Sequence, residues 1–206
     1  MPRGIQKYGW LLAGTVLLAV AVAGIAQSTR AALAQALYRT TKFGIIRESP
    51  PEFTIRRAEQ AHRLYPYNYF FCIWTAEKAY YERVGPDRRV QPSRLEAAWQ
   101  WCEKAMALNP YNSQANRLKT RLLARQSPRD ALEHWRDYVD WYFWEPYHHA
   151  VLVDLYVRVG DVAGASDALR WLEGTTYYAH ALAAIQSIQE PEDLDARIES
   201  LIQQGF

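Results

Sequence analysis

The chain has 206 residues, half of them hydrophobic and 14% aromatic, which is enough for one domain of moderate size with a packed core. Its net charge of +2 conceals a division: residues 137–206 hold twelve Asp and Glu against three Lys and Arg, so the preceding part is basic. No run of five or six like charges occurs, and this pattern argues against a nucleic-acid-binding protein.

The beginning of the chain contains an uncharged, apolar segment from about Tyr8 to Ala26, between Lys7 and Arg30. About twenty helical residues cross the hydrocarbon core of a bilayer, and a Tyr and a Trp stand at the front edge, where amphipathic rings prefer the interface. We therefore expect residues 1–27 to form a transmembrane anchor. A Gly-Ile-Ala sequence at its end leaves a cleavable signal peptide as the alternative.

Small residues in this segment leave a surface on which another helix can pack closely, and we expect that packing at Gly14, Ala19 and Ala23. The flanking charges do not decide the orientation. A short basic tail before a first apolar helix more often stays inside. We therefore expect a single-pass protein of a bacterial inner membrane, with the rest of the chain on the periplasmic side.

The segment 28–50 reads as a juxtamembrane helix and a linker. Its helix either continues the membrane span or starts anew with a cap at Ser28 or Thr29. The remainder, 51–206, is predicted to be a domain of short helices with short connections, apart from a longer one at 84–94. These helices are predicted at 51–64, 68–84, 93–108, 113–126, 128–143, 147–159, 161–173, 175–189 and 191–204.

A Pro-Tyr-Asn or Pro-Tyr-His triplet begins at Pro66, Pro110 and Pro146, each time between two predicted helices. Proline ends a helix because the residue before it is pushed out of the α region. The Asn can cap the next helix by accepting a hydrogen bond from a free backbone N–H group, and we expect the Tyr to pack against the following turn. The triplets therefore predict boundaries between helix pairs.

The spacing of these prolines is about 34 residues once the long connection is set aside, and a helix-turn-helix unit of this period resembles the tetratricopeptide repeat. The best match covers 147–172, with the family's large, small and turn positions at Leu152, Val153, Tyr156, Gly160, Ala165, Leu169 and Leu172. The resemblance spans about 50–205. It implies an α-solenoid of tetratricopeptide-like repeats. Together with the apolar segment, it predicts an all-α fold in which an N-terminal transmembrane helix precedes the solenoid.

The resemblance also implies a partner-binding groove lined by the first helix of each pair. Carried over to this chain, the groove residues are Ile73, Glu77, Tyr80, Tyr81, Asn116, Thr120, Leu123, Asp154 and Arg158. The alternative is a solvated face without a ligand.

The densest aromatic segment lies at 134–149. Helical spacing separates Trp135 from Trp141 and Trp144, so we expect most of the segment to be core. We expect the remainder to be an exposed patch for a partner, a glycan or lipid headgroups. The candidate patch comprises Trp135, Trp141, Trp144 and Tyr147.

No phosphate-binding, acyl-transfer or metal-dependent hydrolase motif is present, and we expect a protein that is not an enzyme. The three histidines at 134, 148 and 149 lack Cys or carboxylate partners at ligand spacing, so we expect no metal and no cofactor. Cys72 and Cys102 fall on the two helices of one pair. They are two small buried groups or, in an oxidising compartment, a disulfide.

These observations predict an accessory or assembly subunit of a larger membrane protein complex, which binds partners through its repeats and its anchor helix. The alternative is a membrane-tethered receptor or adaptor for a peptide, glycan or client protein, which binds in the groove or at the Trp-rich patch. Basic residues offer an additional contact with anionic lipid headgroups. They include Arg30, Arg39, Lys42, Arg56, Arg57 and Arg117. We expect protein subunits and the lipid bilayer as partners, and no nucleic acid.

Overall fold

Helices form the regular structure of this protein. The computed structural model describes residues 3–43, 51–81 and 92–188. In these ranges the helices are α1 (Arg3–Phe43), α2 (Pro51–Leu64), α3 (Tyr69–Tyr81), α4 (Pro92–Leu108), α5 (Ser113–Ala124), α6 (Pro128–Val139), α7 (Pro146–Val159), α8 (Val162–Arg170) and α9 (Tyr178–Ser187). The described residues contain no strand, and the all-α prediction is confirmed. The helix predicted at 191–204 lies outside them.

The largest difference between a predicted and an observed helix is at the end of α6. The sequence predicted a helix over 128–143, whereas α6 ends at Val139. The backbone then turns through hydrogen bonds between residues three apart, 2.9 to 3.2 Å long. Pro146 fixes the other end of this segment, because the residue before a proline is excluded from the helical region. Glu145 accordingly has an extended backbone, with ψ at 109°.

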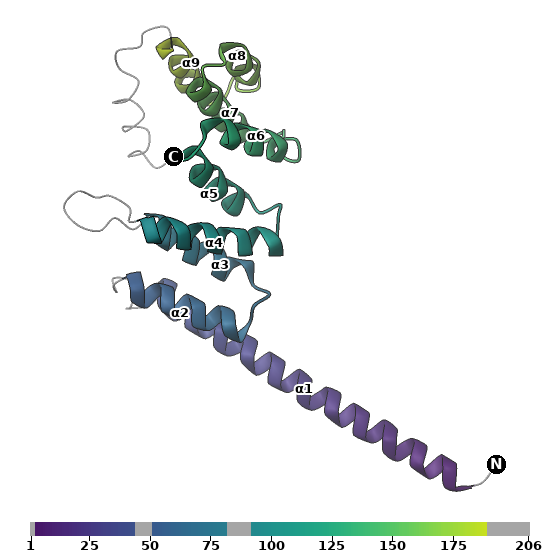
Figure 1. Cartoon of the computed structure of the whole chain (residues 1–206). Coiled ribbons are helices and arrows are strands. Elements are labelled where there is room, and N and C mark those ends of the chain that lie inside the picture. The colour runs from purple at the N-terminus through teal and green to yellow at the C-terminus, as the bar shows by residue number, and fades with distance from the viewer. Residues whose placement is uncertain (1–2, 44–50, 82–91, 189–206) are drawn as a thin grey trace. The chain divides into compact units, whose positions relative to one another are not determined.

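The first helix, α1, runs without a break from the apolar segment into the helices that follow (Figure 1). Thr29 does not cap a new helix, because its hydroxyl donates to the carbonyl four residues earlier (2.9 Å). Farther along, Ala34 and Tyr38 are buried in a core with α2 and α3. Within the predicted juxtamembrane helix and linker at 28–50, residues 28–43 are helical and 44–50 lie outside the described residues. The last part of α1 serves as the first helix of a pair with α2.

The chain divides into two compact units between Asn109 and Pro110, at the second Pro-Tyr-Asn triplet. In the first unit, α1 packs on α2, α2 on α3, and α3 on α4. Small side chains lie at these contacts and allow the helices to approach closely. Those that are fully buried include Ala34, Ala58, Ala61, Ala76, Ala79, Ala98 and Ala105.

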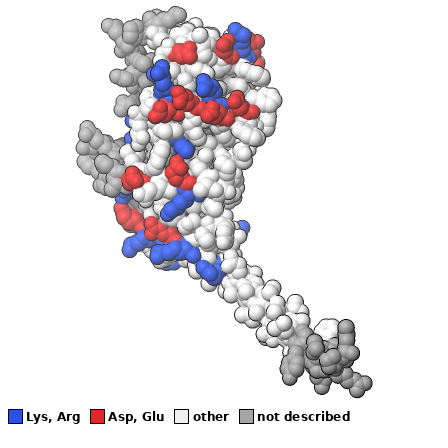
Figure 2. Space-filling view, turned by 45° about the vertical axis from the view of Figure 1, so that its right-hand side comes forward, with Lys and Arg blue, Asp and Glu red and all other residues white. Residues whose placement is uncertain are grey.

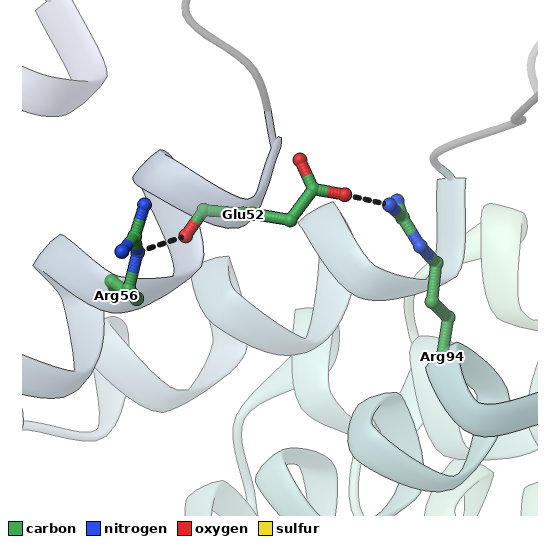
Figure 3. A network of polar contacts seen from close by, with 3 residues as sticks. All are labelled: Glu52, Arg56 and Arg94. Carbon is green, nitrogen blue, oxygen red and sulfur yellow. Dashed lines mark hydrogen bonds and ion pairs between the residues drawn. The ribbon is translucent and has the colours of Figure 1, made fainter.

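An ion pair joins the beginnings of α2 and α4 (Figure 3). The carboxylate of Glu52 accepts a hydrogen bond from the guanidinium of Arg94, and the Glu52 carbonyl accepts one from Nε of Arg56 at 3.4 Å. The Glu52 side chain is 62% exposed, whereas the Arg94 side chain is 13% exposed. Because water screens the carboxylate, the pair contributes on the order of 1 kcal/mol to stability. Its main consequence is to hold Arg94 against the first turn of α2.

In the second unit, α5 packs on α6, α6 on α7 and α7 on α8, and α9 closes the unit against α7 and α8. The core surrounds Trp135, which is fully buried. The predicted turn between α7 and α8 is confirmed. Gly160 ends α7 with a left-handed backbone (φ 78°), and the side chain of Asp161 caps α8 by accepting from the Gly164 N–H at 2.8 Å.

The asparagines of the two Pro-Tyr-Asn triplets cap helices as predicted, but the tyrosines do not pack as predicted. Asn68 accepts from the backbone of Phe70, and Asn112 accepts from the backbone of Ala115, both at 3.0 Å. The predicted packing of the tyrosines against the next turn was wrong: Tyr67 is 68% exposed and Tyr111 is 49% exposed.

Candidate partner-binding surfaces

A pocket of about 410 Å³ lies in the first unit, where the ends of α1 and α3 meet the first turn of α2. Its lining combines rings, hydroxyls and charged groups: Thr41, Lys42, Phe43, Thr54, Trp74, Glu77, Lys78 and Tyr81. Lys42 is held in place, because its Nζ donates to the Tyr38 hydroxyl at 2.8 Å and lies over the rings of Tyr38 and Phe43. Two of the predicted groove residues, Glu77 and Tyr81, therefore line one pocket.

Three other residues predicted for the groove are buried and do not offer their side chains to a ligand. Ile73, Asn116 and Thr120 are 2%, 2% and 4% exposed. The Asn116 amide donates to the carbonyls of Pro110 (2.7 Å) and Asn112 (2.9 Å), so it braces the turn before α5. Thr120 donates to the Asn116 carbonyl. The family pattern assigned them correctly to the first helix of a pair but to the wrong face of it.

The remaining groove candidates lie at or near the surface. Tyr80 is half-buried and packs edge-on against Tyr81 in the first unit. In the second unit Leu123 is half-buried against the core, while Arg158 is exposed. Burial raises the pKa of Asp154, and the positive charge of Arg158 opposes that shift. Within the second unit, Asp154 and Arg158 share α7 one turn apart and form a local pair of charges.

The predicted aromatic patch divides between core and surface. Trp135 belongs to the core, where it is 0% exposed and its Nε1 donates to the His148 carbonyl at 3.0 Å. Its assignment to the patch was therefore wrong, because the helical face that carries it turns inward. Tyr147 is half-buried, with the Arg117 guanidinium 5.9 Å from its ring centre. Trp141 and Trp144, on the turns after α6, are 58% and 62% exposed.

Three further exposed aromatic residues lie in the second unit: Tyr111 (49%), Phe143 (51%) and Trp171 (57%). The ring of Tyr111 contacts Trp141 at 5.0 Å between centres, and Phe143 lies 6.2 Å from Trp171. Sequence analysis did not select Trp171. The exposure of Trp171 could have been predicted from its position. The buried residues of this segment recur at Ala165, Ala168 and Leu172, and Trp171 does not lie on the same helix face.

The apolar part of α1 is exposed along its length. From Trp10 through Arg30 every residue is exposed, including Gly14, Ala19 and Ala23, and a side chain added at Gly14 would meet nothing within 4 Å. Figure 2 shows no charged side chain on the visible face of this projecting segment, while basic residues gather where it joins the other helices. In length and composition α1 is sufficient to span a membrane, a property that signal sequences share.

The two cysteines lie inside the first unit. Cys72 and Cys102 are both buried, and neither forms a disulfide. Cys72 Sγ lies 3.5 Å from His62 Nδ1, and burial raises the pKa of this thiol to about 11, so it stays protonated. Among the residues that the structure describes, no three His, Cys, Asp or Glu side chains are grouped so as to hold a metal ion.

Comparison with solved structures identifies the architecture. The structure of a MamA RS-1 ArsTM double mutant superposes on 80% of this chain and 97% of its own, with a TM-score of 0.51 and 12% sequence identity. MamA contains tetratricopeptide repeats. The fold is a tetratricopeptide-like helical repeat. At this identity the likeness concerns the fold alone. No protein-family model and no curated protein sequence matches the chain.

Proposed function

We propose that this protein is a non-enzymatic scaffold, an accessory or assembly subunit of a larger membrane protein complex. One observation carries the proposal: a single helix, α1, presents an exposed apolar surface at one end and core residues of the helical repeats at the other. A helix with that surface is stable in a bilayer rather than in water. The repeat fold supplies faces suited to protein partners.

The subunit proposal assigns two binding elements to the chain. The anchor contributes the small residues Gly14, Ala19 and Ala23, which permit close helix packing in lipid. The repeats contribute Glu77, Tyr80 and Tyr81 in the first unit, and Leu123, Asp154 and Arg158 in the second. The domain lies on the periplasmic side of a bacterial inner membrane in this proposal, following the short basic stretch with Arg3 and Lys7 before the apolar segment.

The test is to tag the C-terminus, extract native membranes in a mild detergent, and identify the copurifying proteins by mass spectrometry with stoichiometry. A subunit retains one set of partners at fixed ratio. Replacing Ala19 and Ala23 by Leu fills the close-packing surface and is expected to reduce recovery of the partners about tenfold, the effect of losing about 1.4 kcal/mol. Ala21→Leu, the same kind of change on the other side of α1, about 160° from Ala19 and Ala23, provides the matched control.

Unchanged recovery with the Ala19 and Ala23 variants would remove anchor packing from the proposal. A protein that purifies alone, or with many partners in small amounts, would contradict the subunit function itself.

The exposed aromatic residues of the second unit favour a second candidate, a membrane-tethered receptor or adaptor. Trp141, Phe143, Trp144 and Trp171 are each more than half exposed. Aromatic rings of this size supply much of the energy of protein and glycan recognition when a ligand covers them. A receptor would keep its ligand when the anchor is replaced by an unrelated transmembrane helix. It would lose that ligand in a Trp141→Ala, Trp144→Ala variant.

A further inference from the structure

The turn between α2 and α3 carries large side chains that are exposed and do not belong to the hydrophobic core. Tyr67 is 68% exposed, Phe70 is 44% exposed, and Arg63 is exposed at the end of α2. The Tyr67 ring packs edge-on with Tyr65, with 5.9 Å between centres. The Phe70 N–H donates a hydrogen bond to the side chain of Asn68 within the turn. Two aromatic rings and a guanidinium are thus exposed within eight residues of the chain, at this turn of the first unit.

Ring contacts and the pocket fix how far along α1 this turn lies. The Tyr38 ring lies 5.0 Å from Phe71 and 5.4 Å from Trp74, and Phe43 shares the pocket with Tyr81. The helices α1 and α3 therefore run in the same direction, and the beginning of α3 is nearer the apolar part of α1. Figure 1 shows the α2–α3 connection at this end of the first unit. By helix rise, Asn68 stands beside about residue 34 of α1.

The same rise gives the height of the turn above a bilayer that α1 crosses. The uncharged apolar segment from about Tyr8 to Ala26 spans most of a hydrocarbon core of about 30 Å. Residue 34 then lies about 12 Å beyond the core, just outside a headgroup layer about 5 to 8 Å thick, a difference that long side chains such as Tyr and Arg can bridge. Tyrosine rings and arginine side chains are favoured in this layer, because each combines an apolar body with a polar end.

We propose that the α2–α3 turn is a second membrane contact, in which Tyr67, Phe70 and Arg63 lie among the lipid headgroups beside the point where α1 leaves the bilayer. The first unit therefore rests on the membrane surface. The unbroken helix makes this contact possible, because no flexible linker separates Thr29 from the core that begins at Ala34. The inference rests on the proposed membrane anchoring of α1.

The experiment places one environment-sensitive fluorophore at a time on the full-length protein in vesicles of mixed neutral and anionic lipid. Tyr67→Cys marks the turn, and Tyr81→Cys, on an exposed tyrosine at the other end of α3, is the matched control. Val16→Cys marks the middle of the apolar segment. Both native cysteines are buried, so labelling under native conditions is selective for the introduced thiol. Circular dichroism confirms that each variant is helical.

Lipids with spin labels at the headgroup or deep in the acyl chain report the depth of each fluorophore. The label at 67 is expected to be quenched by the headgroup probe about twofold more than the label at 81, and the label at 16 by the deep probe. Equal, weak quenching at 67 and 81, with deep quenching at 16, would overturn the second contact and leave the anchor intact. Absence of deep quenching at 16 would overturn both.

Discussion

His148 lies in the core of the second unit among aromatic rings, 5.4 Å from Trp135 and 5.2 Å from Tyr138 between centres. Its Nδ1 is buried without a hydrogen-bond partner. Burial lowers the pKa of this imidazole below its ordinary value of 6.5. The folded protein therefore binds the proton more weakly than the unfolded chain, and unfolding takes up a proton as the pH falls through 6.5.

The expected consequence is a loss of stability in acid. The contribution of His148 is complete above pH 6.5 and declines below it, by up to about 1.4 kcal/mol per pH unit for one group. His148→Phe removes the titrating group and the unpaired nitrogen while keeping an aromatic ring. It is expected to raise the free energy of unfolding at pH 5 relative to the native protein and to flatten the decline between pH 7 and 5.

Denaturant unfolding at pH 7, 6 and 5 measures this effect. Tyr142→Phe is the control, since it alters the same aromatic cluster and keeps the imidazole of His148. His62 in the first unit also has a lowered pKa, through burial and the charge of Lys104, so a shallow decline remains in the variant. An unchanged slope in His148→Phe would show that His148 does not titrate on unfolding.

Among the helices, α8 depends most on its ends, because it has only nine residues. A helix this short is marginal without its cap and its packing. Gly160 lets the chain reverse, and the Asp161 carboxylate accepts from Gly164 at 2.8 Å. Both residues were predictable from sequence, since a Gly-Asp pair between two apolar periods signals a helix end followed by a cap.

Asp161→Ala is expected to destabilise the second unit by about 1 kcal/mol, because the N–H groups of the first turn of α8 lose their acceptor. Asp161→Asn keeps an acceptor oxygen and is expected to cost less than half as much. Hydrogen exchange of the amides of α8 and the midpoint of thermal unfolding measure the two effects. Equal losses in both variants would mean that charge, rather than capping, accounts for the contribution of Asp161.

For the molecule as a whole, the continuity of α1 has the largest consequence. In an unbroken helix, each inserted residue rotates everything beyond it by about 100° and advances it by about 1.5 Å. If anchor and repeats bind one complex together, their relative rotation matters. The stretch between Thr29 and Ala34 is the place to change it, because Ala32 and Leu33 are exposed and precede Ala34, the first buried residue of the core.

Two alanines inserted after Ala32 rotate the repeats relative to the anchor by about 200°. Four alanines rotate them by about 40° net, but move them twice as far along the helix axis. The two-residue insertion is therefore expected to reduce copurification of partners more strongly than the four-residue insertion. A loss that grows with length instead would indicate that height above the membrane, and not rotation, is decisive. A lack of effect from both would argue for partners bound by only one of the two elements.

The sequence alone was sufficient to predict where the helices lie, where most of them end, and which small residues lie at their contacts. They depend on interactions within a few residues: Pro66 and Pro110 end helices by local sterics, Asn112 caps one, and the buried alanines recur with the period of a helix. The groove and the aromatic patch were only partly predictable. Asn116 and Trp135 lie on the expected helices, but both are buried.

The reason for this division is that burial is not a local property. The exposure of Tyr67 depends on Phe71 and Trp74, which occupy the core against α1, a helix distant from it in sequence. The apolar segment and the first repeat share one helix for a similar reason. Ala34 and Tyr38 pack against α2 and α3, and this packing favours one continuous helix, whereas the local sequence at Thr29 allowed two separate helices. Local patterns therefore established the helices, whereas packing between distant segments determined which side chains remain for lipid and protein partners.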